Sequence, residues 1–257
     1  MLDLVVVITI IGILVSLSVP MILTARDRSG RYHCSERLRQ LGQAWRQYAQ
    51  DYGRLPCTRP SFGPEAVPDV TNSGCAAADP FGPDGPRPNN VPAVAFLLLR
   101  TGKLKADSLI CPATRGAPDR FAGLLPWQRS NFTDVHKNLT YSVQNPYATA
   151  AAQARGFRWD MQLPKSFVLA ADRSPGEDAL VSPDSPAAQI RNGNSNNHGK
   201  RGQNVLYADG RVEFEATPFA GIDRDNIYTS RNNKTLDSPQ DGADSILLPA
   251  EPIAAKR

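Results

Sequence analysis

The sequence lacks several short patterns that identify common enzyme and metal-binding classes. No two of its four cysteines form a CxxC pair, which argues against zinc ribbons and thioredoxin-like redox centres. The GxSxG, HExxH and Walker-type phosphate-loop patterns are also missing. Basic and acidic residues nearly balance, at 29 against 25, and no basic stripe is interleaved with aromatic residues. We therefore expect neither an enzyme nor a nucleic-acid partner.

Charged residues are absent from a long stretch near the amino terminus. Residues Leu4 to Leu23 carry no charge, and one acid, Asp3, precedes them. About 20 residues that rise about 1.5 Å each span a bilayer core, so we expect a transmembrane helix over residues 1–23. No Lys or Arg precedes the run, which is also longer than the core of a signal peptide. We predict a retained membrane anchor rather than a cleaved signal.

An amphipathic helix is expected to continue from the anchor over residues 24–55. Its apolar residues recur at spacings of four and three: Cys34, Leu38, Leu41, Trp45, Tyr48 and Tyr52. This spacing is that of one apolar helix face, and Gly53 followed by Pro56 ends it. We interpret the helix as one packed on a domain core, with Cys34 buried or bridged. A basic helix lying on anionic lipid is the alternative.

The rest of the chain predicts a loop-rich α+β domain. Prolines concentrate in residues 56–92, where we expect an irregular loop, and residues 93–235 should form an α/β domain. Its predicted elements are a short helix at Ala93–Leu99 and strands at Leu139–Val143 and Phe167–Ala171. The last segment, residues 236–257, is rich in Pro, Ala and Asp and is expected to be flexible. The order of elements predicts a long helix packed on an antiparallel sheet.

The segment NVLYADGRVEFE predicts a β-hairpin over residues 204–215. Two alternating runs flank Asp209-Gly210, a dipeptide that supplies the positive φ angles of a two-residue type I′ turn. With that turn, one face of the hairpin would carry Val205, Tyr207, Val212 and Phe214. We interpret His198, Asp209 and Gly210 as a structural element, in which His198 hydrogen-bonds the hairpin or the sheet, and we favour this over ligand binding.

Other groupings of reactive side chains are weak. The three histidines, His33, His136 and His198, are far apart in the sequence, and a triad of His198, Asp172 and Ser195 has no nucleophile motif behind it. Several acids near the carboxyl end could offer oxygen ligands to Ca²⁺, without an EF-hand spacing: Asp223, Asp225, Asp237, Asp241 and Asp244. We expect no cofactor and leave calcium as an open alternative.

The four cysteines are even in number, which in an exported chain favours disulfides. Cys57 and Cys75 bracket the first half of the proline-rich segment. A bond between them would close a loop of about twenty residues and contribute roughly 3 kcal/mol in the chain-entropy model. We predict this Cys57–Cys75 disulfide.

Several of these motifs resemble one known family. Asp3 to Leu14 (DLVVVITIIGIL), Pro20 and the helix that follows resemble the prepilin-type N-terminus of type II secretion pseudopilins. They are most similar to a planctomycete-type subgroup, which has a cysteine before an Asn-Leu-Lys-Gln-Leu-Gly-type helix, a central Cys-Pro and a C-terminal H-x9-DG motif. Cys34, Cys111-Pro112 and His198 with Asp209-Gly210 match these features, with ten residues in place of nine between His and Asp. We also predict a Cys34–Cys111 disulfide.

The resemblance implies a type IV pilin-like fold, in which the membrane helix continues into a soluble helix packed on an antiparallel sheet with long irregular loops. In that family, a peptidase cleaves a basic leader, and the exposed amine pairs with an acid of a neighbouring subunit. Asp3 would take that role here, where the family has glutamate. We expect the true start to lie upstream of Met1, with prepilin peptidase as a partner if such a leader exists.

The function that the resemblance implies is that of a pseudopilin-like structural subunit of a type II secretion or type IV pilus-like fibre. Its partners would be other pseudopilin-like subunits, bound through the N-terminal helix, and the bacterial inner membrane, crossed once. The soluble domain would lie in the periplasm or on the cell surface in a fibre. The alternative is a membrane-anchored envelope protein that does not polymerise and whose loop-rich domain binds a ligand such as a glycan.

Overall fold

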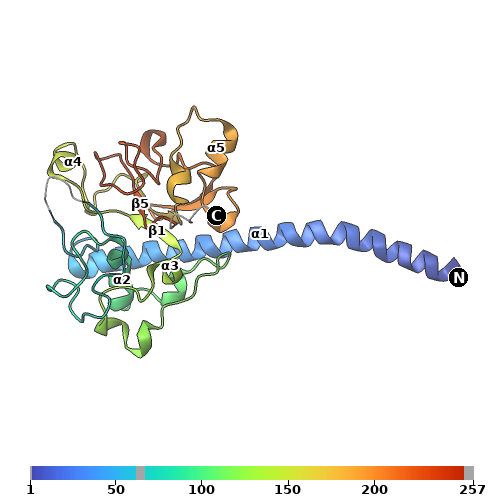
Figure 1. Cartoon of the computed structure of the whole chain (residues 1–257), viewed down its shortest axis with the longest axis horizontal. Coiled ribbons are helices and arrows are strands. Elements are labelled where there is room, and N and C mark those ends of the chain that lie inside the picture. Colours follow the sequence, from blue (N-terminus) through green and yellow to red (C-terminus); the bar gives the residue numbers. More distant parts are fainter. Residues whose placement is uncertain (1, 62–66, 252–257) are drawn as a thin grey trace.

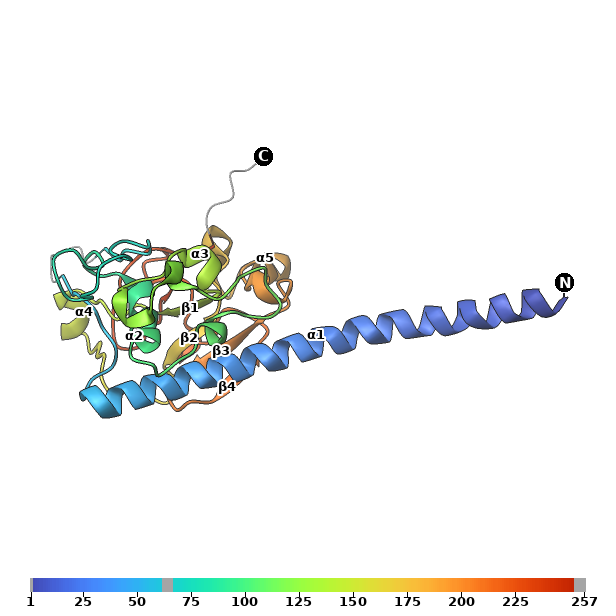
Figure 2. The ribbon, with the colours of Figure 1, turned by 90° about the horizontal axis from the view of Figure 1, so that it is seen from below.

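The structure is a computed structural model that describes residues 2–61 and 67–251, with most side chains before Arg28 outside the description. Helix α1 (Leu2–Tyr52) runs unbroken through the segment predicted to be an anchor and through the amphipathic segment. Its first half projects from a globular part, and its second half lies along that part (Figures 1 and 2). The fold is α+β and loop-rich, with the second half of this long helix packed on a five-stranded antiparallel sheet.

The apolar face of α1 is the part of the helix that contacts the core. The side chains of Cys34, Leu38, Leu41, Trp45 and Tyr48 are at most 3% exposed, as the spacing predicts. Tyr52 was expected on the same face but is 53% exposed, because it lies in the last turn, next to solvent. Its ring instead stacks on that of Tyr48 at 4.4 Å. Gly53 follows with φ +68° and ends the helix, as expected.

All neighbouring strands of the sheet are antiparallel, in the order β4-β3-β2-β1-β5. The strands are β1 (Tyr141–Gln144), β2 (Val168–Asp172), β3 (Gln203–Tyr207), β4 (Val212–Glu215) and β5 (Leu247–Leu248). The first two confirm the strands predicted near Leu139–Val143 and Phe167–Ala171. The strand β5 was not expected, since it lies in the segment predicted to be flexible. Ile246, Leu247 and Leu248 are fully buried or nearly so, and they hold residues up to 251 against the sheet.

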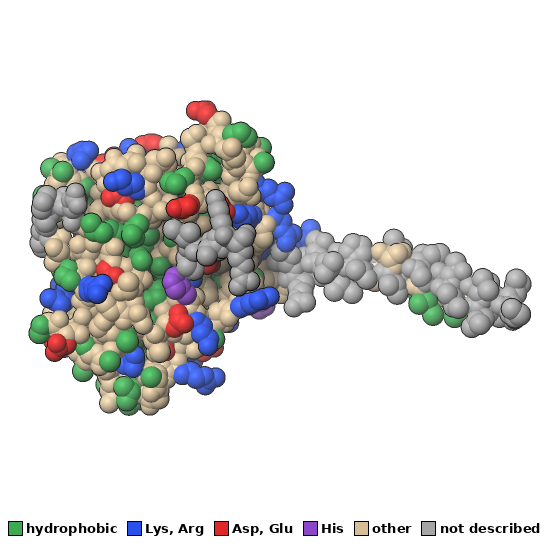
Figure 3. All heavy atoms as spheres, in the orientation of Figure 1, with side chains coloured by type: hydrophobic (Ala, Val, Ile, Leu, Met, Phe, Trp, Pro, Cys, Tyr) green, Lys and Arg blue, Asp and Glu red, His purple; other side chains and the backbone are tan. Residues whose placement is uncertain are grey.

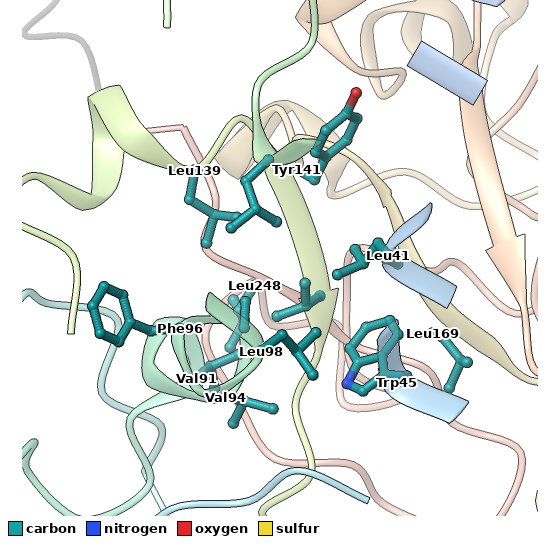
Figure 4. Packing of buried hydrophobic residues seen from close by; sticks show 14 of the residues in the cluster. Leu41, Trp45, Val91, Val94, Phe96, Leu98, Leu139, Tyr141, Leu169 and Leu248 are labelled. Carbon is teal, nitrogen blue, oxygen red and sulfur yellow. The ribbon is translucent and has the colours of Figure 1, made fainter. Parts of the chain in front are cut away.

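Helix α2 (Val91–Arg100) confirms the short helix predicted after the proline-rich segment. Its first backbone N–H groups are capped by the Asn90 side chain, which accepts from Ala93 N–H at 2.8 Å. Every residue of α2 except Arg100 is buried. Figure 4 shows α1, α2 and the sheet contributing to one core, through Leu41, Trp45, Val94, Leu98, Tyr141, Leu169 and Leu248.

The hairpin of β3 and β4 forms as predicted, but its loop has three residues instead of two. Tyr207 N–H donates to Arg211 O at 3.0 Å, and Gly210 N–H donates to Tyr207 O at 2.9 Å. Gly210 has φ +88°, whereas Asp209 has no positive φ. This is a type I turn followed by a left-handed residue, and the predicted type I′ turn is wrong.

The extra loop residue shifts the strand register by one, which exchanges the two faces of the hairpin. Leu206 is opposite Val212, and Asn204 is opposite Phe214. The prediction that Val205 and Tyr207 share a face with Val212 is therefore wrong. Leu206 and Val212 pack in the core on α1, while Val205 and Tyr207 pack in a second cluster with Tyr228 and Ile227.

Short helices and loops connect these elements. The α-helices are α3 (Val135–Asn138), α4 (Ala150–Ala154) and α5 (Ala187–Asn192). The 3₁₀ helices are η1 (Ala106–Leu109), η2 (Phe121–Gly123), η3 (Pro126–Gln128), η4 (Gly176–Ala179), η5 (Asn196–His198) and η6 (Ile222–Arg224). The described part of the proline-rich segment is irregular, as expected. It is held by buried amides: Asn131 Nδ2 donates to Thr71 O and Ser73 O, and Asn90 Nδ2 donates to Asp69 Oδ2.

The predicted membrane anchor falls mostly outside the described side chains. The backbone of Asp3 is part of α1, but the Asp3 side chain is outside the description. Met1 is outside it as well. Among the described residues, no helix combines the length and the apolar character that crossing a membrane requires. On the face in view in Figure 3, Lys and Arg side chains gather at the end of the globular part from which α1 projects.

Candidate functional site

Four potential metal-binding side chains meet in the interior, between α1 and the sheet. They are Cys34, Cys111, Asp172 and His198, and all four are buried. One ligand atom from each lies within 4.8 Å of the others. Each comes from a different element: α1, the segment after η1, the end of β2, and η5. Only the tertiary fold brings them together, and we call this group the Cys-His-Asp cluster.

The two cysteines of the cluster are joined by a disulfide, which confirms the predicted Cys34–Cys111 pair. The bond ties α1 to the segment that precedes Pro112, and its two half-cystines are 77 positions apart in the sequence. Cys34 is the first fully buried side chain along α1 among those described. The disulfide therefore fixes α1 to the globular part close to the point where the helix leaves it.

The other two cysteines are free, so the predicted Cys57–Cys75 disulfide does not form. Cys57 lies beside Tyr147, whose hydroxyl accepts from the N–H of the next residue, Thr58. Cys75 is fixed elsewhere, because its backbone carbonyl accepts from Ser130 N–H. Burial raises the pKa of the Cys57 thiol to about 11, which makes it a poor nucleophile at neutral pH.

His198 and Asp172 form a buried pair next to the disulfide. His198 Nε2 lies 3.2 Å from Asp172 Oδ2 and 3.8 Å from Cys111 Sγ. The same nitrogen is 3.2 Å from Asn204 Nδ2 on β3. The imidazole ring also meets the Phe214 ring edge-on, at 6.1 Å between centroids. His198 therefore contacts the hairpin, as expected, and the sheet and the disulfide as well.

The Asp172 carboxylate is held by donors from two neighbouring elements. Oδ2 accepts from the backbone N–H of Asn204 at 2.7 Å and from its side-chain amide at 3.0 Å. Oδ1 accepts from Asn197 Nδ2 at 3.0 Å. A carboxylate that is removed from water needs such donors to offset the loss of hydration. They also fix which oxygen faces His198.

Local sequence features aim His198 into the interior. Ser195 caps η5 by accepting from Asn197 N–H, and Gly199 continues the chain at φ +64°. Asn197 Nδ2 also donates to Thr140 O, which anchors η5 to the start of β1. The Ser195 hydroxyl thus serves as a helix cap, and within the described residues no hydrogen bond joins it to His198. The triad of His198, Asp172 and Ser195 is not assembled.

The remaining predicted residues lie elsewhere. His33 and His136 are exposed and do not join His198. Asp209 and Gly210 lie at the hairpin turn, where Arg46 of α1 donates to Asp209 O at 3.1 Å. The turn thus helps to hold the hairpin against α1, which agrees with its interpretation as a structural element.

The acids considered for calcium divide into two groups. Asp225, Asp241 and Asp244 interact electrostatically, whereas Asp223 is exposed and Asp237 accepts from the Ser230 hydroxyl. Burial raises the pKa of Asp225 to about 8 and that of Asp244 to about 6. Among the described residues, these acids do not come close enough together to form one group of candidate metal ligands.

Sequence reasoning missed the two asparagines that hold the cluster together, Asn197 and Asn204. Asn197 lies in a polar segment, NGNSNNHG, that is typical of a surface loop. Asn204 lies in a strand whose pairing register was predicted one residue out. The pattern that could have indicated their role is the run of asparagines directly before His198. Comparisons with models of protein families, with curated proteins and with solved structures found no match to this chain.

Proposed function

We propose that this chain is a pseudopilin-like structural subunit, which assembles through its N-terminal helix into a type II secretion or type IV pilus-like fibre. The observation that carries the proposal is the single helix α1, whose first half stands clear of the globular part while its second half is packed on the antiparallel sheet (Figure 2). A helix of this kind leaves one end free to pack against copies of itself. The globular part would face outward from the fibre.

Exposed apolar side chains on the projecting half of α1 support this proposal. Val7, Ile11 and Leu14 are 51%, 54% and 58% exposed, and their spacing of four and three places them on one helix face. Apolar side chains in a row on one face favour a covering of lipid or of other helices. In the proposed fibre they would be covered first by the inner membrane and then by neighbouring subunits.

Asp3 has a specific role in this proposal. Asp3 is the second residue of α1. It would pair with the processed amine of a neighbouring subunit, because a charge left alone in a low-dielectric surrounding is costly. The mass and N-terminal sequence of the protein isolated from membranes test the processing step. A start upstream of Met1 with an N-methylated apolar residue supports prepilin processing, and a start at Met1 removes the basis for the Asp3 pairing.

Cysteine crosslinking between projecting helices tests assembly. Val7→Cys and Leu14→Cys are introduced together into a chain that also carries Cys57→Ser and Cys75→Ser, and membranes are oxidised before non-reducing electrophoresis. We expect a ladder of crosslinked oligomers, since each subunit would contact two neighbours. Either cysteine alone should give no species beyond the dimer. The matched control is Met161→Cys, at a side chain that is 56% exposed on the globular part.

A second outcome would favour the envelope protein that does not polymerise. If the two anchor cysteines give only monomers and the control gives the same, the projecting helices do not meet and the fibre is excluded. The globular part has a surface hollow of about 720 Å³, where a ligand such as a glycan could bind. Some of residues 180–185 and some of residues 219–233 line it. Binding of oligosaccharides to the monomer would then be the property to measure.

A further inference from the structure

We propose that the Cys-His-Asp cluster is a zinc site when the chain is reduced, and that the Cys34–Cys111 disulfide is its metal-free, oxidised form. The four ligands would be the Cys34 and Cys111 thiolates, His198 Nε2 and one oxygen of Asp172. This inference does not depend on the proposed fibre. It concerns the interior of the globular part, whether or not the chain assembles.

The ligand set has the chemistry that zinc prefers. Zinc binds four protein ligands in a closed tetrahedron when its role is structural, and it takes thiolate, imidazole and carboxylate groups. The four candidate ligand atoms already lie within 4.8 Å of one another. His198 Nε2, the nitrogen that would bind the metal, is the one that faces Cys111 Sγ and Asp172 Oδ2.

The geometry of the backbone is compatible with both states. The Cα atoms of Cys34 and Cys111 are 5.2 Å apart. Rotation of the two side chains can widen the distance between the sulfurs to about 3.8 Å, the edge of a tetrahedron with Zn–S bonds of about 2.3 Å. The site is enclosed, because all four side chains are buried.

The surroundings supply the support that metal ligands need. Asn204 and Asn197 donate to Asp172 and hold its carboxylate in place, which is the usual arrangement around a ligating carboxylate. A zinc ion with two thiolates and a carboxylate carries one net negative charge. The Arg37 guanidinium, which donates to the carbonyl of Ile110 beside Cys111, provides a neighbouring positive charge.

A disulfide alone does not account for the cluster. A bridged pair of cysteines needs no imidazole and no carboxylate beside it, and burying a His–Asp pair in a core carries a desolvation cost. The arrangement in which His198 and Asp172 converge on the cysteine sulfurs is explained by a metal that all four groups share. Loss of the metal on oxidation then leaves the pair that the structure contains.

The interconversion is a two-electron thiol–disulfide exchange. The oxidant is a second disulfide, either a protein disulfide or a low-molecular-weight one. The two thiolates form the Cys34–Cys111 bond, and their two electrons cleave the S–S bond of the oxidant. The oxidant's two sulfurs take up two protons from solvent, and Zn²⁺ is released. The reverse reaction needs a dithiol reductant and zinc.

Metal titration of the full chain in detergent tests the proposal. The protein is reduced with a phosphine, freed of metal, and titrated with Zn²⁺ and separately with Co²⁺. We expect one zinc ion per reduced chain and a Co²⁺ spectrum with thiolate-to-metal charge transfer, together with protection of Cys34 and Cys111 from alkylation. The oxidised chain should bind no zinc at this site.

Variants separate the site from the other thiols. Cys57→Ser with Cys75→Ser is the matched control and should keep the full affinity, while Cys34→Ser with Cys111→Ser should abolish the charge-transfer band. His198→Ala and Asp172→Asn each remove a ligand and should weaken zinc binding by more than the roughly tenfold to hundredfold that loss of a partner outside the ligand set costs. If those variants fail to fold, the unaltered chain decides. Less than one zinc per reduced chain, or unprotected Cys34 and Cys111, would overturn the proposal.

Discussion

At the scale of single residues, Asp225 and Asp244 hold carboxyl groups largely away from solvent. Asp225 Oδ2 accepts from Ser245 N–H at 2.9 Å, and Asp244 Oδ2 accepts from Gln240 N–H at 2.7 Å. Burial raises both pKa values, to about 8 and about 6, and the proximity of the two carboxyl groups raises that of Asp225 further. These groups make the stability of the fold depend on pH.

The sign of this dependence follows from the direction of the shift. Below pH 3.8 the carboxyl is protonated in both states. As the pH rises from there to about 8, the Asp225 carboxyl ionises in the unfolded chain but stays neutral in the folded one, so unfolding is increasingly favoured. Above the folded pKa both states are ionised and the destabilisation stays constant. Stability should therefore fall between pH 4 and pH 8.

Asp225→Asn should remove most of this pH dependence, since the amide oxygen can still accept from Ser245 N–H. We expect the variant to exceed the unaltered chain by several kcal/mol in free energy of unfolding at pH 8, at about 1.4 kcal/mol per unit of pKa shift, and by much less at pH 4. Urea unfolding at both pH values, followed by tryptophan fluorescence, measures the difference. Asp223→Asn, at an exposed neighbour, should show no such change. A constant difference at both pH values would contradict the assignment.

At the scale of elements, the helix-to-sheet contact depends on a glycine. A Cβ atom on Gly42 of α1 would lie 2.9 Å from Leu206 Cδ1 on β3. Leu206 is fully buried in the core between the two elements, so it has little room to move. The absence of a side chain at this position lets the helix approach the sheet closely.

Gly42→Leu should therefore push α1 from the sheet and destabilise the fold by about 2 kcal/mol, a typical cost of overpacking. Gln43→Leu is the matched control, since it adds the same side chain at the next position, which is exposed, and should change stability by less than about 0.5 kcal/mol. Thermal unfolding followed by circular dichroism compares the two. Equal stability of both variants would mean that Leu206 and its neighbours move aside without a cost in free energy.

Sequence reasoning predicted elements better than registers. Periodicity fixed the buried face of α1, since five side chains between Cys34 and Tyr48 repeat at helical spacing. The sequence pattern failed to predict the register of the hairpin. The dipeptide Asp209-Gly210 suits both a two-residue type I′ loop and a three-residue loop, and the additional loop residue exchanges the two faces. The pattern also failed for β5, because a run of three apolar residues, Ile246 to Leu248, shows no alternation. The cluster partners on β2, β3 and η5 depend on tertiary contacts that no local pattern encodes.

The hairpin turn gives a direct test of the observed loop. Gly210 has φ +88°, a conformation that most L-residues adopt only at a cost. Gly210→Ala should lose about 1 kcal/mol of stability, while Gly210→Asn should lose less, because Asn tolerates the left-handed region. Both variants bring a Cβ atom to the Arg46 guanidinium, so their difference isolates the backbone effect. Chemical denaturation of the pair measures it, and equal losses would exclude a left-handed Gly210.

At the scale of the whole molecule, one disulfide joins the long helix to the rest of the fold. It links two cysteines that are 77 positions apart in the sequence, and closing a loop of that length should contribute about 4 kcal/mol in the chain-entropy model. Cys34→Ala with Cys111→Ala should lower the free energy of unfolding by about that amount in metal-free, oxidising buffer. Cys57→Ser with Cys75→Ser is the control and should change it little. A loss as large in the control would show that the second pair is bonded too.

Counting thiols checks the covalent structure independently. Denatured, unreduced protein should react with two equivalents of an alkylating reagent, and peptide mapping should place the label on Cys57 and Cys75. A reaction with four equivalents would show that the native protein has no Cys34–Cys111 bond. The absence of any reaction would show that Cys57 and Cys75 are bonded, as predicted from the sequence.

The position of the disulfide determines how the molecule would respond to mechanical force. A pull on the free end of α1 would, without a covalent tie, peel the helix from the sheet one turn at a time, beginning near Cys34. Because Cys34 is bonded to Cys111, tension passes at that point into the globular part instead of into the first contacts. The packed half of the helix, from Leu38 to Tyr48, then carries less of the force. Oxidation of Cys34 and Cys111 thus replaces a non-covalent contact with a covalent bond at the point where the force enters the globular part.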